Sequence, residues 1–183
     1  VYPGNKLFHI EEDAQPTNIY GMSKLEGEKY CTYYDAMILR TNFVELTQKN
    51  DGKGLLDWAF REIKLNSKIT LYNNIYFTPL YIKTLINILI DIVLEDKHKN
   101  EIYNLGGKKR YSKAELITTL REKLSLETTN AEIAPFQEDS QSKYKYPKEL
   151  SINSEKIKEL DLNTGNEDII YELLKGYNER TNS

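Results

Sequence analysis

The stretch PTNIYGMSKLEGEKYCTYYDAMILRTNFV, residues 16–44, places an amphipathic segment directly before a short apolar run. Apolar side chains recur at helical spacing from Ile19 to Tyr30, which predicts a helix between residues 17 and 34. The run DAMILRT at 35–41 is typical of a strand in the interior of a parallel sheet. A helix followed by such a strand indicates an α/β fold.

The alternation of helices and strands continues along the chain. Ser112 and Glu115 form the capping-box pattern that opens a helix. Asn166 is the expected start of the last helix, near 166–178. The other expected elements are helices at GLLDWAFREIKLN, YIKTLINILIDIVLED and 154–160, strands at KITLY and EIYNLGG, and an irregular segment at 127–150. This order predicts a parallel sheet with helices packed on its faces.

Bulk composition limits the classes of partner. A chain of 183 residues suits one domain, and a net charge of -3 gives no bias toward nucleic acid or anionic membranes. The longest apolar run, TLINILIDIVL at 84–94, is too short to span a bilayer. The single cysteine, Cys31, has no disulfide partner within the chain. We therefore expect no nucleic-acid or membrane partner and a reducing compartment, the cytoplasm.

No metal site is expected either. The chain has two isolated histidines and one run of adjacent acids, and acids in a polar loop are usually solvated. These residues are His9, His98, Glu11, Glu12 and Asp13.

The pattern Tyr-x-x-x-Lys is the main chemical signal, but it occurs four times, at Tyr2/Lys6, Tyr20/Lys24, Tyr144/Lys148 and Tyr171/Lys175. Proline or glycine interrupts the first and third copies, so no helix joins those residues. The fourth copy lies in a terminal amphipathic helix without a flanking loop. Context therefore favours Tyr20 and Lys24 as the candidate catalytic pair.

The spacing suits acid–base chemistry. Residues four apart share one face of a helix, so Lys24 is expected beside Tyr20. A phenol ionises with a pKa of about 10, and a nearby lysine cation stabilises the phenolate and lowers that value. Such a pair can donate a proton at neutral pH.

The segments VYPG, EEDAQP, NIYGMSKLEGE and ILRTNFV occur in an order that resembles the extended short-chain dehydrogenase/reductase family, most closely its dTDP-4-dehydrorhamnose reductase branch. The later segments FTPLYIKTLINIL, EIYNLGG and YPKELSINSEKIKEL agree with this resemblance. It implies the C-terminal part of a Rossmann-type parallel sheet plus a mixed substrate-binding lobe, with the N-terminal glycine-rich half absent from this chain.

The resemblance also implies a division of the chain, which is expected to be one partial unit over 1–183. Residues 1–50 and about 100–107 would supply sheet elements and the tyrosine–lysine helix of the dinucleotide-binding domain. Residues 51–99 and 108–183 would form mainly the substrate-binding lobe. A catalytic serine or threonine is expected upstream of Val1, so this chain alone is not expected to carry out the reaction.

For the site, the resemblance implies that NADPH or NADH reduces the 4-keto group of a nucleotide sugar. Tyr20 would donate the proton, and Lys24 would also bind the nicotinamide ribose. Thr41 and Asn42 follow the buried strand at its C-terminal end, where ligands bind in open α/β sheets, and are expected to contact the cofactor.

Expected substrate contacts are Asn42, Phe43, Pro79 and Leu80. Phe43 stands where the family often has tryptophan, and Leu80 stands where the branch usually has threonine, so the sugar specificity is left open. A homodimer is among the assemblies that the resemblance allows.

Two other functions stay open at this point. One is an NAD-dependent nucleotide-sugar epimerase or 4,6-dehydratase, which uses the same Tyr/Lys pair but keeps its NAD bound. The other is a non-catalytic regulatory or binding subunit, similar to the partner of methionine adenosyltransferase.

Overall fold

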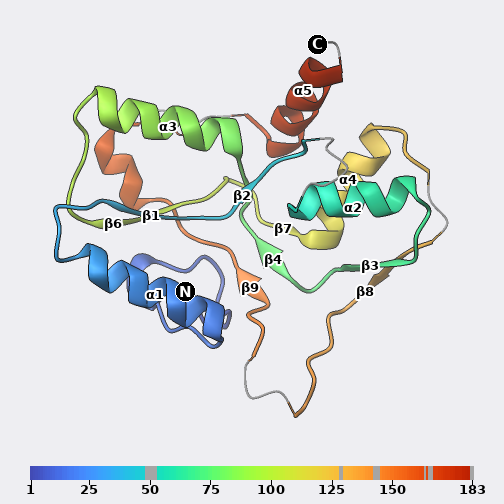
Figure 1. The fold of residues 1–183 in the computed structure, drawn as a ribbon, viewed down its shortest axis with the longest axis horizontal. Coiled ribbons are helices and arrows are strands. Elements are labelled where there is room, and N and C mark those ends of the chain that lie inside the picture. The colour runs from blue at the N-terminus through green and yellow to red at the C-terminus, as the bar shows by residue number, and fades with distance from the viewer. Residues whose placement is uncertain (48–52, 128–129, 142–144, 163, 165–166, 182–183) are drawn as a thin grey trace.

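The computed structural model describes residues 1–47, 53–127, 130–141, 145–162, 164 and 167–181. Its elements, in chain order, are η1 Glu11–Asp13, α1 Ile19–Cys31, β1 Ile38–Thr41, β2 Phe43–Val44, α2 Leu55–Lys64, β3 Ile69–Tyr72, β4 Tyr76–Phe77, β5 Leu80–Tyr81, α3 Ile82–Leu94, β6 Ile102–Leu105, β7 Tyr111–Ser112, α4 Lys113–Lys123, β8 Ala131–Ala134, β9 Glu149–Leu150, η2 Lys156–Leu160 and α5 Ile169–Thr181. Figure 1 shows α3 and α1 on opposite sides of the β1–β6 pair. The predicted α/β class is confirmed.

Most of the predicted elements are present. The capping box at Ser112 and Glu115 opens α4 as expected, with both reciprocal hydrogen bonds formed. The helix expected near 154–160 is a short 3-10 helix, η2. Asn166, expected to open the last helix, lies outside the described residues. None of the helices in the described part of the chain is both long and apolar enough to cross a bilayer.

The segment 127–150, predicted to be irregular, contains two strands, so that prediction was wrong. Strand β8 pairs in parallel with β3, and β9 pairs in parallel with β4. The sequence AEIA of β8 has no apolar alternation, and its partner strand lies far away along the chain. Pairing of this kind depends on tertiary context rather than on local propensity.

A small apolar cluster surrounds the β1–β6 pair. The two strands are parallel, with Ile38 opposite Ile102 and Thr41 opposite Leu105. Helix α3, strand β6 and η2 contribute most of the cluster, through Leu85, Ile88, Ile92, Tyr103, Leu105, Ile157 and Leu160. This packing fixes the carboxyl end of β1, where Asn42 follows. The division of the chain into two domains stays a prediction.

A larger core lies around α2, α4 and β3 (Figure 1). Its buried side chains come from all three elements and from α5, and include Leu56, Ala59, Leu71, Leu116, Leu120 and Leu173. Apolar residues of α2 belong to this core or pack against it, namely Leu55, Leu56, Ala59, Phe60 and Ile63. This core lies in the part of the molecule that contains α2, α4, β3 and α5, and Figure 1 shows α1 apart from these elements.

Helix α1 begins at a capped end. The side-chain oxygen of Asn18 accepts a hydrogen bond from the Gly21 N–H at 2.8 Å, which satisfies one first-turn amide. Gly21 is also the one buried residue of α1. Met22 and Tyr30 are 47% and 64% exposed. An apolar face therefore does not hold α1 in the described part of the chain.

Candidate functional site

A cleft of about 960 Å³ opens between helix α1, the end of strand β1 and the segment that leads into β9. Its lining includes Tyr20 and Lys24 from α1, and Thr41, Asn42 and Phe43 from the end of β1. The predicted catalytic and cofactor-binding residues thus share one cleft with two of the predicted substrate-binding residues, Asn42 and Phe43. The adjoining apolar lining lets the cleft exclude water from part of a bound molecule.

Tyr20 and Lys24 lie as the helical spacing predicted. Lys24 Nζ is 5.4 Å from the centroid of the Tyr20 ring. The Tyr20 side chain is 72% exposed, so its hydroxyl is open to a molecule in the cleft. The contact places the lysine cation at the face of the Tyr20 ring.

The other Tyr-x-x-x-Lys copies do not reproduce this setting. Tyr2 is buried, and Tyr144 lies outside the described residues. Tyr171 and Lys175 border a hollow whose described lining comes from α5 alone. Tyr171 is therefore a matched control for Tyr20, because it is also exposed and helical.

Asn42 ties the end of β1 to two neighbouring segments. Its side-chain Nδ2 donates to the Leu150 carbonyl oxygen at 2.8 Å, and its own carbonyl accepts from the Leu80 N–H at 2.9 Å. The Thr41 hydroxyl oxygen, in contrast, is buried and has no hydrogen-bond partner among the described residues. The Asn42 amide thus attaches β9 to the end of β1, whereas the Thr41 hydroxyl makes no hydrogen bond to the described residues.

The predicted substrate residues are divided between two places. Phe43 is 56% exposed and lines the cleft. Pro79 and Leu80 instead line a second cavity of about 490 Å³, and Leu80 is 4% exposed within the small apolar cluster. Leu80 lies opposite Phe43 in the pairing of β5 with β2, but it does not line the first cleft. The structure does not bring Pro79 and Leu80 beside Tyr20.

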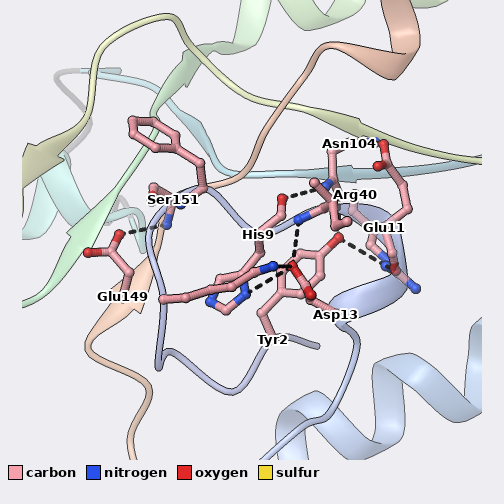
Figure 2. A network of polar contacts seen from close by, with 11 residues as sticks. Tyr2, His9, Glu11, Asp13, Arg40, Asn104, Glu149 and Ser151 are labelled. Carbon is pink, nitrogen blue, oxygen red and sulfur yellow. Dashed lines mark hydrogen bonds and ion pairs between the residues drawn. The ribbon is translucent and has the colours of Figure 1, made fainter.

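A polar network borders the cleft, and Figure 2 shows its members Tyr2, Arg40 and Asn104. Arg40 donates to both oxygens of Glu28, at 2.9 and 2.7 Å, and to the Tyr2 hydroxyl at 2.9 Å. The Tyr2 hydroxyl donates in turn to the side chain of Asn104 on β6. Burial acts to lower the pKa of Arg40, but the hydrogen bonds to Glu28 and Tyr2 outweigh it and raise that pKa above its ordinary value. The network joins α1, β1 and β6.

Sequence reasoning assigned no role to Glu28, Arg40 or Tyr2, although all of them line the cleft. A signal was present in two places. Glu28 continues the face of Tyr20 and Lys24 by one more helical turn. Arg40 is a charged residue inside an otherwise apolar strand segment, and a buried charge is rarely left unpaired.

The segment before β9 supplies the opposite wall, and the sequence did not indicate it. Lys145, Tyr146 and Pro147 line the cleft. The Thr17 hydroxyl donates to the Lys145 carbonyl at 3.0 Å, which attaches this wall to the loop in front of α1. The Lys145 side chain adds an exposed cation to the cleft.

The adjacent acids near the N-terminus are engaged within the fold. Glu11 Oε1 accepts from the Asn104 N–H at 2.6 Å, and Asp13 Oδ2 lies 2.6 Å from Lys6 Nζ. Among the described residues no group of three or more His, Cys, Asp or Glu side chains could hold a metal ion.

The burial of His9 leads us to expect that the free energy of unfolding depends on pH. It is fully buried, stacks on Tyr2 and lies 3.7 Å from Asp13. Burial lowers the pKa of His9, although Asp13 acts in the opposite direction. The unfolded chain therefore binds a proton at a higher pH than the folded chain, so stability should fall as the pH drops below about 6.5.

We expect urea unfolding between about pH 7 and 5 to show this loss, and His9→Phe, which retains a stacked ring, to reduce it. His98→Phe is the control, because His98 is exposed and should leave the slope unchanged. Equal slopes for the wild type and His9→Phe would contradict the prediction.

Comparisons with known proteins agree with this architecture. The sequence matches the family described as the RmlD substrate binding domain over residues 1–167. No curated protein matches the chain. The chain spans 58% of a solved structure titled hypothetical dTDP-4-dehydrorhamnose reductase from Sulfolobus tokodaii, with 92% of this chain covered, 25% identity and a TM-score of 0.71.

Two further solved structures share the fold. One is a dTDP-4-dehydrorhamnose reductase from Clostridium acetobutylicum, with 18% identity, a TM-score of 0.79, and coverage of 100% of this chain and 63% of that one. The other is a UDP-glucuronic acid 4-epimerase from Bacillus cereus, with 20% identity, a TM-score of 0.76, and coverage of 96% and 56%. The resemblance inferred from the sequence is confirmed, and the chain belongs to the RmlD substrate binding domain family.

Proposed function

We propose that the complete gene product is a nucleotide-sugar reductase that reduces a 4-keto sugar with NADPH or NADH. The observation that carries the proposal is the placement of Tyr20, Lys24, Thr41 and Phe43 in one cleft. An exposed phenol beside a lysine, at the carboxyl end of a parallel strand, suits proton transfer to a carbonyl oxygen.

The residues of the cleft fit a nicotinamide dinucleotide. The buried Thr41 hydroxyl, unpartnered among the described residues, offers a hydrogen bond beside the tyrosine–lysine pair. Exposed Lys24 and Lys145 offer positive charge, which suits the phosphates of a cofactor or of a nucleotide sugar. When bound, the nicotinamide would supply the hydride.

The roles of the chain's own residues follow from their positions. Tyr20 donates its hydroxyl proton to the carbonyl oxygen as the carbonyl carbon becomes a secondary alcohol carbon. Lys24 stabilises the phenolate that remains on Tyr20 until a proton from solvent restores the phenol. Phe43, which is exposed in the cleft, supplies an apolar surface against which a sugar ring can pack.

A second candidate is a nucleotide-sugar epimerase, because the solved fold of the UDP-glucuronic acid 4-epimerase has a TM-score of 0.76 with this chain. In that case the cofactor would be oxidised and reduced in turn within one catalytic cycle. Added NADPH or NADH would then not be consumed.

The test uses the complete gene product with NADPH or NADH and candidate 4-keto nucleotide sugars. We expect stoichiometric oxidation of the reduced nicotinamide and formation of the 4-hydroxy sugar, followed by absorbance and mass spectrometry. Interconversion of sugar epimers without net oxidation would support the epimerase instead. Absence of both reactions across dTDP- and UDP-linked substrates would refute an enzymatic role.

A further inference from the structure

The Lys24 ammonium has no carboxylate partner among the residues that the structure describes. No ion pair joins it to an acid there, and its recorded contact is the Tyr20 ring. An acid is nevertheless close along the helix, because Glu28 lies one turn after Lys24. Residues at this spacing are neighbours on a helix surface and commonly pair. The unpaired state of Lys24 therefore has to be explained.

The Glu28 carboxylate is instead bound to Arg40. Its two carboxylate oxygens accept from Nε and Nη2 of Arg40 at 2.9 and 2.7 Å, a two-pronged contact that fixes the carboxylate plane. The two side chains are 13% and 8% exposed. The pair is thus shielded from water. Dissolved salt therefore screens the attraction between its two charges less than it would screen a pair on the surface.

Arg40 is itself held in place. Its Nη1 donates to the Tyr2 hydroxyl at 2.9 Å and to the Glu11 carbonyl oxygen at 2.6 Å. With these contacts Arg40 cannot follow Glu28 toward Lys24 without losing two hydrogen bonds. The contacts come from the N-terminal segment, so the orientation of Glu28 is set by residues outside α1.

Another acid on the same helix, Glu26, has no arginine partner among the described residues and pairs with a neighbouring lysine. Glu26 lies 3.0 Å from Lys29, three residues later, and both side chains are more than half exposed. One acid and one lysine of α1 thus pair where no third group competes, in the acid-before-lysine order that helices favour over the order of Lys24 and Glu28. Glu28 also differs from Glu26 in having Arg40 as a partner.

We propose that Arg40 is a positioning residue that keeps Glu28 away from Lys24. The Lys24 ammonium then has no described carboxylate beside it to offset its positive charge toward Tyr20 and toward a ligand in the cleft. This inference rests on the proposed function for the role of Lys24, but the pairing itself can be measured without any activity.

The experiment measures the acylation rate of each lysine by pulsed labelling and peptide mass spectrometry on the 183-residue chain. In Arg40→Met, Glu28 is released and should pair with Lys24, which lowers the Lys24 labelling rate about 1.5-fold. In the double variant Arg40→Met/Glu28→Gln the rate should return to that of the wild type. Glu28→Gln alone should leave it unchanged.

Lys29 is the internal control, because its partner Glu26 is unaltered in every variant. Arg40→Lys serves if Arg40→Met fails to fold, since a single ammonium leaves one Glu28 oxygen free and should give a smaller decrease. An unchanged Lys24 rate in a folded Arg40 variant would overturn the proposal, as would an equal decrease in the double variant. A loss of structure caused by removing Arg40 would change the Lys24 labelling rate equally in Arg40→Met and in Arg40→Met/Glu28→Gln. If the Lys24 labelling rates change as expected while the complete gene product does not reduce 4-keto nucleotide sugars with NADPH or NADH, the proposed function fails and the positioning role stands.

Discussion

Tyr20→Phe is expected to lower the rate of carbonyl reduction by the complete gene product about a thousandfold. The variant keeps the ring that Lys24 contacts and removes only the proton donor. The ring is 72% exposed, so the free energy of unfolding should not change measurably. Steady-state kcat and thermal unfolding together test both parts of this expectation.

Tyr171→Phe is the matched control for that experiment. Tyr171 is 55% exposed, belongs to helix α5 and also precedes a lysine by four residues. We expect kcat within a factor of about two of the wild type, because none of the described α5 side chains lines the cleft. An active Tyr20→Phe enzyme, or an equal loss in both variants, would contradict Tyr20 as the proton donor.

The second large effect is expected on stability. Gly107 follows β6, and a Cβ at this position would overlap the carbonyl oxygen of Pro79. The Gly107 N–H also donates to the Thr78 carbonyl at 3.1 Å, so the two backbones are held close together. Gly107→Ala has to push these backbones apart, and we expect it to cost about 3 kcal/mol in the free energy of unfolding.

Gly27→Ala provides the opposite expectation. Gly27 lies within α1, and no atom outside its immediate helical neighbourhood lies within 4 Å of an added Cβ. Alanine should therefore stabilise the chain by about 0.5 to 1 kcal/mol. Urea unfolding of both variants measures the pair. A Gly107→Ala chain as stable as the wild type would show that the approach of residues 79 and 107 is not tight.

Local signals predicted most of the helices and one side of the cleft. The capping box fixed the start of α4, and the four-residue spacing placed Lys24 beside Tyr20. The apolar run at 35–41 correctly predicted β1, and the end of a parallel strand is where Thr41 was expected to meet a ligand. Each of these signals is contained within a few neighbouring residues.

Contacts between distant segments could not be predicted in the same way. Lys145 reaches the cleft because Thr17 and Asn42 hold the segment before and at β9, and neither hydrogen bond has a signature in local sequence. Leu80 was assigned to the substrate by the family resemblance, but its side chain packs into the apolar cluster. A sequence pattern gives the position of a residue along a strand, whereas the side-chain environment depends on which segments pack beside it.

The sparse burial of α1 has a consequence for the kinetics of local opening. With Gly21 as its one buried residue, the helix is secured mainly by its N-cap and the Glu28–Arg40 pair, so its amides should exchange with solvent faster than those of α2. The element that carries Tyr20 and Lys24 is then the one most stabilised when the cleft is filled. Part of the intrinsic binding free energy of a ligand would go into ordering the helix, and the measured affinity would be weaker by that amount.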